Sequence, residues 1–208
     1  MTKNSAFIPN KWVYKIKLDK YIGRLVLKGF MEKNSGDTFS PTLKLVILRL
    51  IFALTAVLGF DMLQMDVCNA FVNAKAPSTH AIYTNCPQGY EREGWVLRLE
   101  KALYGLKGSP RAWFEHILNY FESLGLEQSK LDPCLFTLKD KQGHLVMILG
   151  LYVDDLIIGG QSQVISWFKE AISNEFLMED LGTPTRVVGI DVTVINGQLH
   201  TAQTTKLY

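Results

Sequence analysis

Two adjacent aspartates, Asp154 and Asp155, are flanked by short apolar runs at residues 145–151 and 156–158. Unbroken apolar runs that are rich in β-branched residues and bounded by glycine are typical of strands buried on both faces of a sheet. The pattern therefore predicts a strand, a turn and a second strand, with both carboxylates at the turn. Two carboxylates in an apolar setting repel each other, so we expect cations or hydrogen-bond donors there. An isolated Asp-Asp pair is more often only the solvated turn of a hairpin, and a third carboxylate is needed to favour a metal site.

Length and composition predict a globular chain with a substantial core. The 208 residues are 48% hydrophobic and 20% charged, which is enough for a substantial core and two lobes. Two lobes of one domain are favoured over two independent domains because the irregular residues 75–93 do not separate two complete cores. The formal net charge is +2. This value neither requires nor excludes an anionic partner, so any surface that binds nucleic acid must be local.

The cysteines and the N-terminus point to an intracellular setting. Cys68, Cys86 and Cys134 are odd in number and lack a Cys-x-x-Cys pair, which favours neither a disulfide framework nor a zinc site. Residues 1–10 contain no apolar core of a signal peptide. The longest apolar stretch, residues 43–60, is interrupted by two basic residues and is too short to cross a bilayer, so we expect no membrane partner.

Hydrophobic periodicity divides the rest of the chain into strands and helices. The expected strands are residues 12–17, 24–30, 61–67, 95–99, 132–138, 185–195 and 198–201. The first two form a hairpin, joined near residues 19–23, with one apolar and one basic face, and the last two flank the turn Asn196-Gly197. The least regular part is expected at residues 75–93, which are rich in proline, glycine and polar residues.

Three helices are expected between these strands. Residues 42–58 are apolar nearly all round, which predicts a fully buried helix that ends at Gly59. The other two are amphipathic, at residues 110–124 with Ser109 as N-cap, and at 162–176. The order of elements predicts an α+β fold in which helices lie against one face of an antiparallel sheet.

The third carboxylate is Asp66, at the end of the strand 61–67. The helix that follows could return the chain so that this strand lies beside the Asp154-Asp155 hairpin, and the three acids would then converge. Carboxylate oxygens at rigid strand ends suit Mg²⁺, which binds one or two carboxylates together with water and substrate phosphates. Two such ions clamp the attacking and leaving oxygens of a phosphoryl transfer.

Several collinear blocks spread over nearly all of the chain resemble one family. They are residues 12–17, 24–30, 39–42, 64–67, 70–71, 101–107, 109–114, 132–136, 151–158 and 180–182. With these blocks the chain resembles the reverse transcriptase domain of copia-type LTR retrotransposons. The resemblance implies a right-hand polymerase core, with fingers at residues 1–60 and 75–108 and an antiparallel palm sheet, backed by helices, at residues 61–74 and 109–208.

The resemblance also implies a function and a set of site residues. The function is that of an RNA-directed DNA polymerase, which transfers a nucleotide from a dNTP to a primer 3′-OH with Mg²⁺, or Mn²⁺ as a substitute. The implied catalytic residues are Asp66, Asp154 and Asp155, and the metal ligands are these three with Val67. The implied dNTP contacts are Arg24, Asn69, Ala70, Phe71 and Tyr104, with Phe71 under the sugar and Arg24 on the triphosphate. The implied template and primer contacts are Gly105, Lys107, Ser109, Pro110 and Tyr152.

The chain departs from the family pattern at a few positions. Ile22 stands where lysine is common, which removes one basic contact to the triphosphate, and Gly108 and Ala74 replace the usual glutamine and glycine. We expect the thumb to be largely missing and the RNase H domain to lie outside this chain, so that the chain is a fragment of a polyprotein. The implied partners are a primed RNA or DNA template, dNTPs and those further segments, in the cytoplasm within a virus-like particle for an active element.

Two other readings of the sequence stay open. A catalytically silent, truncated retrotransposon product could retain the fold and bind nucleic acid weakly. A palm-type nucleotide cyclase would also join acids at strand ends to metal ions, but it would need no template. Template-directed primer extension separates both readings from a polymerase.

Overall fold

The computed structural model describes residues 5–17, 20–32, 36–77, 81–195 and 198–202. The chain forms two compact units, residues 1–40 with 69–119 and residues 41–68 with 120–208. The lobes expected from the sequence divide the chain after residue 60, whereas the unit boundary lies between Ser40 and Pro41. The reason is that helix α1, Leu45–Val57, packs against the strands of the second unit. The fold is a mixture of helices and mainly antiparallel sheets, as the α+β prediction requires.

The second unit is built on a six-stranded sheet in the order β11-β4-β10-β9-β8-β7. Its strands are β4 (Asp61–Val67), β7 (Glu127–Gln128), β8 (Leu135–Lys139), β9 (Leu145–Tyr152), β10 (Asp155–Gly160) and β11 (Met178–Gly182). All its neighbouring strands are antiparallel. The apolar runs beside the two aspartates are indeed adjacent central strands, β9 and β10, and both are almost entirely buried.

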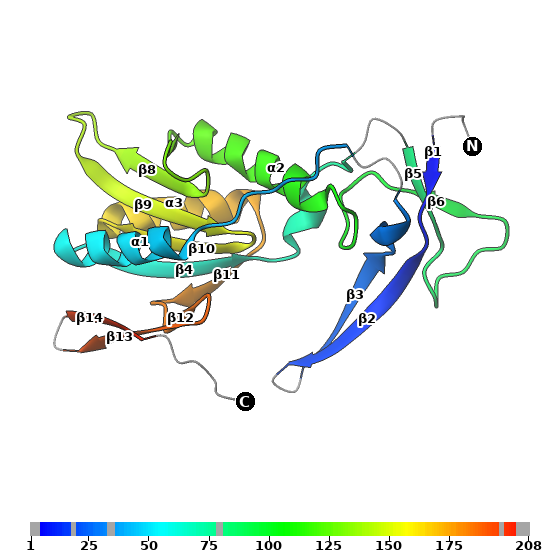
Figure 1. Ribbon diagram of the computed structural model, residues 1–208, viewed down its shortest axis with the longest axis horizontal. Coiled ribbons are helices and arrows are strands. Elements are labelled where there is room, and N and C mark those ends of the chain that lie inside the picture. Colours follow the sequence, from blue (N-terminus) through cyan, green and yellow to red (C-terminus); the bar gives the residue numbers. More distant parts are fainter. Residues whose placement is uncertain (1–4, 18–19, 33–35, 78–80, 196–197, 203–208) are drawn as a thin grey trace. The chain divides into compact units, whose positions relative to one another are not determined.

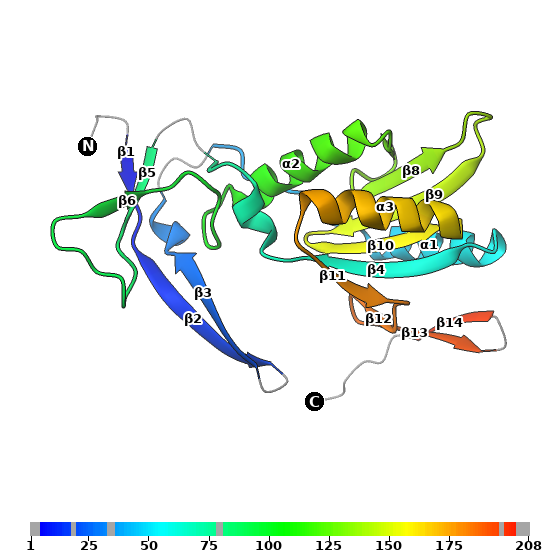
Figure 2. The same ribbon diagram turned by 180° about the vertical axis from the view of Figure 1, so that it is seen from behind.

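Helices cover both faces of this sheet, so the prediction that helices lie on one face is wrong. Successive residues of a strand point to opposite faces, and a Cβ atom on Gly159 would lie 2.1 Å from Thr55 Oγ1 of α1. A Cβ atom on the next residue, Gly160, would instead lie 3.3 Å from Ile165 of α3, Ser162–Glu175. Figures 1 and 2 show α1 and α3 on opposite sides of the sheet. Glycine at 159 lets α1 approach the strand closely.

Helix α1 is less buried than its composition predicts. It begins at Leu45, three residues later than expected, and its apolar run ends before Gly59, which has a φ of 63°. One face is buried, at Ile47, Leu48, Ile51, Phe52 and Thr55. Val46 and Val57 on the other side are 65% and 82% exposed, so the prediction of burial all round is wrong.

Helix α2, Ser109–Ser123, confirms the amphipathic helix expected at residues 110–124, and its last turn belongs to the second unit. There the ring of Phe121 is fully buried, with its centroid 5.0 Å from that of Phe136 and 6.0 Å from that of Phe168. These rings join α2, β8 and α3 into one core. Helix α3 confirms the expected helix at residues 162–176.

The first unit contains the expected hairpin and a second small sheet. Strands β2 (Asn10–Lys17) and β3 (Lys20–Leu27) pair in antiparallel register, so Lys20 to Gly23 belong to a strand and not to the expected turn. Strands β1 (Ser5–Phe7), β5 (Ala81–Asn85) and β6 (Val96–Arg98) form the sheet β1-β5-β6. Strand β5 lies within residues 75–93, so that segment is more regular than its composition indicates. Short 3-10 helices at Gly29–Met31 and Ala70–Asn73 complete this unit.

A third small sheet is formed by the last described residues of the second unit. Strands β12 (Arg186–Val187), β13 (Ile190–Ile195) and β14 (Gln198–Ala202) are antiparallel. The expected strand 185–195 is therefore interrupted, at Val188 and Gly189, which both have positive φ. The hairpin of β13 and β14 is confirmed, while its turn, Asn196-Gly197, lies outside the described residues.

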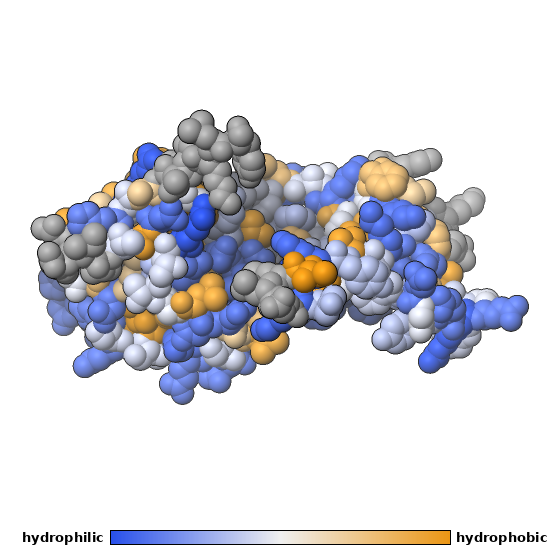
Figure 3. Space-filling model, turned by 90° about the horizontal axis from the view of Figure 1, so that it is seen from below, coloured by the Kyte–Doolittle hydropathy of each residue, from blue (hydrophilic) through white to orange (hydrophobic). Residues whose placement is uncertain are grey.

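Several large apolar side chains are exposed in the described residues. Tyr21 is 87% exposed and Phe30 is 81% exposed. On the face drawn in Figure 3, apolar residues are separated by hydrophilic ones. Among the described residues, no helix combines the length and the apolar character needed to span a membrane.

Candidate active site

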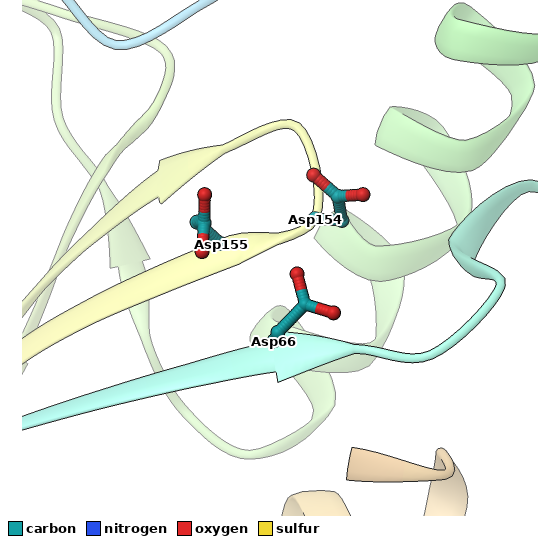
Figure 4. Close-up of side chains that lie close together, drawn as sticks. All are labelled: Asp66, Asp154 and Asp155. Carbon is teal, nitrogen blue, oxygen red and sulfur yellow. The ribbon is translucent and has the colours of Figure 1, made fainter. Parts of the chain in front are cut away.

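The register of β4 and β10 brings Asp66 and Asp155 together. Asp66 is directly opposite Asp155 in the antiparallel pair, so their side chains share one face of the sheet. Asp154 lies in the turn between β9 and β10, where Val153 has a φ of 61°. The backbone N–H of Val67 donates to the carbonyl oxygen of Asp154 at 2.9 Å, which ties this turn to the end of β4. Figure 4 shows the three carboxylates gathered at one end of the sheet.

The three carboxylates fit a divalent cation. One oxygen from each of Asp66, Asp154 and Asp155 lies within 4.8 Å of the others, and all three residues are partly buried. Unit charges at that separation repel by roughly 3 to 4 kcal/mol per pair at an effective dielectric constant of 20. Two ligands of one Mg²⁺ lie at most about 4.2 Å apart, because each bond is about 2.1 Å. The upper bound of 4.8 Å is less than an ångström above this limit, so at most small rotations of the carboxylates bring all three to one cation.

The thiol nearest to this centre in the sequence, that of Cys68, is shifted toward its protonated form. Burial raises the pKa of Cys68, and the charges of Asp66 and Glu179 raise that pKa further. A neutral thiol is a poor metal ligand. The donors that the chain offers here are therefore oxygen atoms, which suits Mg²⁺ or Mn²⁺ better than Zn²⁺.

Two other residues predicted from the sequence lie beside the carboxylates. Val67 is the last residue of β4, directly after Asp66, and the residue is 1% exposed. Tyr152 ends β9 and is directly opposite Asp155 across the hairpin. Gln64, which the sequence analysis missed, donates a hydrogen bond from Nε2 to Oδ1 of Asp155 at 3.3 Å. Its signal in the sequence is a glutamine in an apolar strand, two residues before Asp66.

Three residues predicted to bind the nucleotide form a cluster in the first unit. The guanidinium carbon of Arg24 lies 5.2 Å from the centroid of the Tyr104 ring, within the range of a cation–π contact. The Phe71 ring is tilted against the same tyrosine, with the centroids 4.7 Å apart. Asn69 has left-handed backbone angles and begins the 3-10 turn that carries Phe71, while Ala70 is buried. The turn thus fixes the position of Phe71 beside Tyr104.

Two of the residues predicted to contact template and primer, Gly105 and Lys107, lie on one turn of the first unit. Gly105 has a φ of 90°, and a Cβ atom there would lie 2.0 Å from the carbonyl oxygen of Leu27. Lys107 is held by Glu32, whose Oε2 accepts from its backbone N–H at 3.0 Å and whose carbonyl accepts from its Nζ at 2.8 Å.

The next two predicted contacts, Ser109 and Pro110, begin helix α2. Ser109 is 0% exposed, and its hydroxyl donates to the carbonyl oxygen of Leu103 and accepts from the Leu103 N–H. Its hydroxyl therefore binds the backbone of the preceding turn at Leu103, whereas the sequence predicted that it would cap helix α2. Pro110 is partly buried, and its carbonyl oxygen accepts from the Ser40 hydroxyl at 3.3 Å.

Comparison with known proteins identifies the family. The model of the family described as "Reverse transcriptase (RNA-dependent DNA polymerase)" matches residues 1–207. The chain therefore belongs to the reverse transcriptase family. Its relatives among transposon Pol polyproteins confirm the resemblance to copia-type elements.

Two plant relatives illustrate this similarity. The chain is 34% identical over 195 residues to the retrovirus-related Pol polyprotein from transposon TNT 1-94 of Nicotiana tabacum, covering 88% of this chain and 14% of that polyprotein. It is 30% identical over 206 residues to the corresponding polyprotein from transposon RE2 of Arabidopsis thaliana, covering 93% of this chain and 14% of that polyprotein. The chain thus spans about one seventh of the length of these relatives.

Among solved structures, an apo telomerase from Candida tropicalis, truncated from the C-terminal domain, is similar to this chain. The TM-score is 0.42 at 9% sequence identity, covering 93% of this chain and 55% of that chain. This similarity is too low to support a conclusion about the fold.

Proposed function

We propose that this chain is the catalytic core of an RNA-directed DNA polymerase, which adds deoxynucleotides to a primer 3′-OH. The observation that carries the proposal is the convergence of Asp66, Asp154 and Asp155 at one end of the β4–β10–β9 sheet. Rigid strands position these carboxylates, and only small rotations are needed for them to share a cation. Within a chain of the reverse transcriptase family, such a centre is suited to nucleotidyl transfer.

Asp66 and Asp154 would hold the metal ions, with the backbone of Val67 as a further oxygen donor and Asp155 in a supporting role. Bound Mg²⁺ would neutralise charge on the phosphates and favour ionisation of the primer 3′-OH. The chain's own contribution is to fix the three carboxylates on adjacent strands, so that little reorganisation is required when substrate binds.

Arg24, Phe71 and Tyr104 would bind the incoming dNTP. The guanidinium of Arg24 offers several N–H donors to the triphosphate. Phe71 would lie under the sugar, where an aromatic ring excludes a 2′-hydroxyl by its volume. Tyr104 contacts both residues, so it would hold the charged and the apolar parts of this pocket in one arrangement.

The template and primer would contact Tyr152 and the turn of Gly105 to Pro110. The β2–β3 hairpin supplies a basic surface for the same partner. Residues 10–27 contain five basic residues and one acid, a net charge of +4, so the remainder of a chain of net charge +2 carries −2. This concentration of positive charge favours a polyanionic partner at the hairpin. In this proposal the unit that carries the basic hairpin is the fingers, and the unit that carries Asp66, Asp154 and Asp155 is the palm.

The test is the template dependence of the reaction. The purified chain is incubated with Mg²⁺, a primer and four RNA templates that differ in the base after the primer. A polymerase incorporates the nucleotide that is complementary to each template. Cyclic nucleotide formed without template would instead indicate a cyclase, and no product from a folded, metal-binding chain would indicate a silent product.

Replacing Phe71 with valine should relax the choice of sugar more than it slows incorporation. The shorter side chain leaves room for a 2′-hydroxyl beneath the sugar. We expect the ratio of ribonucleotide to deoxyribonucleotide incorporation efficiency to rise at least tenfold, which corresponds to about 1.4 kcal/mol of lost discrimination. Thermal unfolding is followed in parallel, with Phe39→Val, at a 72% exposed aromatic residue, as the control. An unchanged ratio with a large loss of stability would make Phe71 a core residue only.

The double substitution of Lys15 and Lys20 by glutamine should weaken binding of a primed template. Both side chains are exposed on the hairpin, so their removal should leave the fold unchanged. Each lost phosphate contact lowers the slope of log K against log salt by about 0.9. We expect a decrease of up to about two in that slope, measured by fluorescence anisotropy between low and physiological salt. Lys130→Gln, at an exposed lysine of the other unit, is the control, and an equal slope for all three proteins would refute the hairpin assignment.

A further inference from the structure

Gln64 is a buried polar side chain among the apolar residues of strand β4. It is 9% exposed, and both its neighbours in the strand, Leu63 and Met65, are buried apolar residues. A buried amide requires hydrogen-bond partners, so a glutamine here would be unfavourable if it served packing alone. Its Nε2 donates a hydrogen bond to Oδ1 of Asp155.

The sheet register explains why Gln64 reaches this particular carboxylate. Gln64 and Asp66 are two residues apart in β4, so their side chains lie on the same face. On the neighbouring strand β10, Asp155 is opposite Asp66 and Ile157 is opposite Gln64. Asp155 is therefore the diagonal neighbour of Gln64, at a distance that a long side chain spans.

From this contact we infer that Gln64 is a positioning residue of the metal centre, which holds the Asp155 carboxylate in the orientation that supports metal binding. The inference rests on the proposed function. A hydrogen bond to Oδ1 restricts rotation of the carboxylate about its Cβ–Cγ bond. The amide has no charge, so it fixes Asp155 without neutralising any of the three negative charges that attract the cation. A lysine or arginine at this position would compete with the metal for the same carboxylate.

Strand β4 holds both aspartates of the Asp154-Asp155 pair. Asp155 receives a hydrogen bond from a protein side chain, whereas the backbone carbonyl of Asp154 is held by the N–H of Val67. The β4 strand thus supports both residues of the Asp154-Asp155 pair, one through its side chain and the other through its main chain. Outer partners of this kind orient metal ligands, and their loss lowers metal affinity by about 10- to 100-fold.

The test measures Mn²⁺ binding to the full chain by isothermal titration calorimetry, without nucleotide or template. The variants are Gln64→Met, which keeps the length of the side chain but cannot donate, and Gln64→Asn, which keeps the amide but is one methylene shorter. The matched control is Gln128→Met. Gln128 lies in β7 of the same sheet, and its Nε2 donates to the carbonyl oxygen of Pro133 at 2.8 Å. Strand β7 is separated from β10, which carries Asp155, by β9 and β8.

We expect both Gln64 variants to raise the dissociation constant for Mn²⁺ by about 10- to 100-fold, while Gln128→Met leaves it within twofold of the parent. Thermal unfolding without metal separates positioning from packing, because a purely structural role would lower stability and leave the affinity of the folded protein unchanged. If Gln64→Met does not fold, Gln64→Asn decides the outcome. A dissociation constant within twofold of the parent in a folded Gln64 variant overturns the inference.

A parallel titration of Asp66→Asn keeps this result distinct from the proposed function. Binding that Asp66→Asn abolishes but the Gln64 variants leave intact refutes the role of Gln64 alone. A parent that binds no Mn²⁺ refutes the metal centre itself, and the role of Gln64 falls with it.

Discussion

Replacing Asp154 with asparagine lowers primer extension by on the order of 10³-fold or more, which corresponds to several kcal/mol of lost transition-state stabilisation. The substitution is nearly isosteric, so the turn between β9 and β10 should persist, held by the hydrogen bond from Val67 to the Asp154 carbonyl. What is lost is a negative charge and, in the proposed metal centre, a ligand of the cation. The measurement is single-nucleotide incorporation on a primed template under metal saturation of the parent.

Glu170→Gln is the control for Asp154→Asn, because it removes one negative charge from an exposed position of the same unit. Its rate should remain within about twofold of the parent. Incorporation by Asp154→Asn at the parental rate would show that Asp154 holds no metal. Equal losses in both variants would indicate a nonspecific effect of charge.

Truncation of Phe121 to alanine should lower the free energy of unfolding by about 3 to 5 kcal/mol. The ring is 0% exposed and contacts two further buried rings, so its removal leaves a cavity at the junction of α2, β8 and α3. Since domains are stable by only about 5 to 15 kcal/mol, this loss is a large part of the total. Urea unfolding followed by far-ultraviolet circular dichroism measures it.

The matched control for Phe121→Ala is Leu177→Ala, which truncates a side chain that is 72% exposed in the same unit. A change within about 0.5 kcal/mol is expected there. A loss below about 1 kcal/mol for Phe121→Ala would contradict the assignment of this aromatic cluster as the core that supports the sheet.

The parts of the fold that were predicted correctly are those with a strong local signal. The Asp154-Asp155 hairpin follows from two apolar runs around a polar turn, α1 follows from an apolar run that stops at Gly59, and α2 and α3 follow from helical periodicity. The missed strands have weak local signals. Strand β11, Met178–Gly182, is a mostly polar edge strand with an irregular register, and β5 acquires its structure by pairing with β1 and β6.

The convergence of Asp66, Asp154 and Asp155 was predictable from the sequence, but the contacts around them were not. Acids that follow apolar strands are visible in the sequence, but the face that each side chain shares depends on strand register, which is non-local. The contact between Gln64 and Asp155 is of this kind, because the two residues are 91 positions apart. The burial of the Ser109 hydroxyl against Leu103 likewise follows from the path of a turn and not from residue type. The distribution of helices over both faces is visible in the different neighbours of Gly159 and Gly160, which are known only from the packed structure.

The central claim is that Asp66, Asp154 and Asp155 form one divalent-metal centre. The most direct measurement is anomalous diffraction from crystals of the chain soaked in Mn²⁺. We predict a strong anomalous peak within about 2.3 Å of carboxylate oxygens of both Asp66 and Asp154, absent from crystals of Asp66→Asn treated in the same way. A difference map without such a peak at full Mn²⁺ loading, or a peak that persists in Asp66→Asn, would contradict the account.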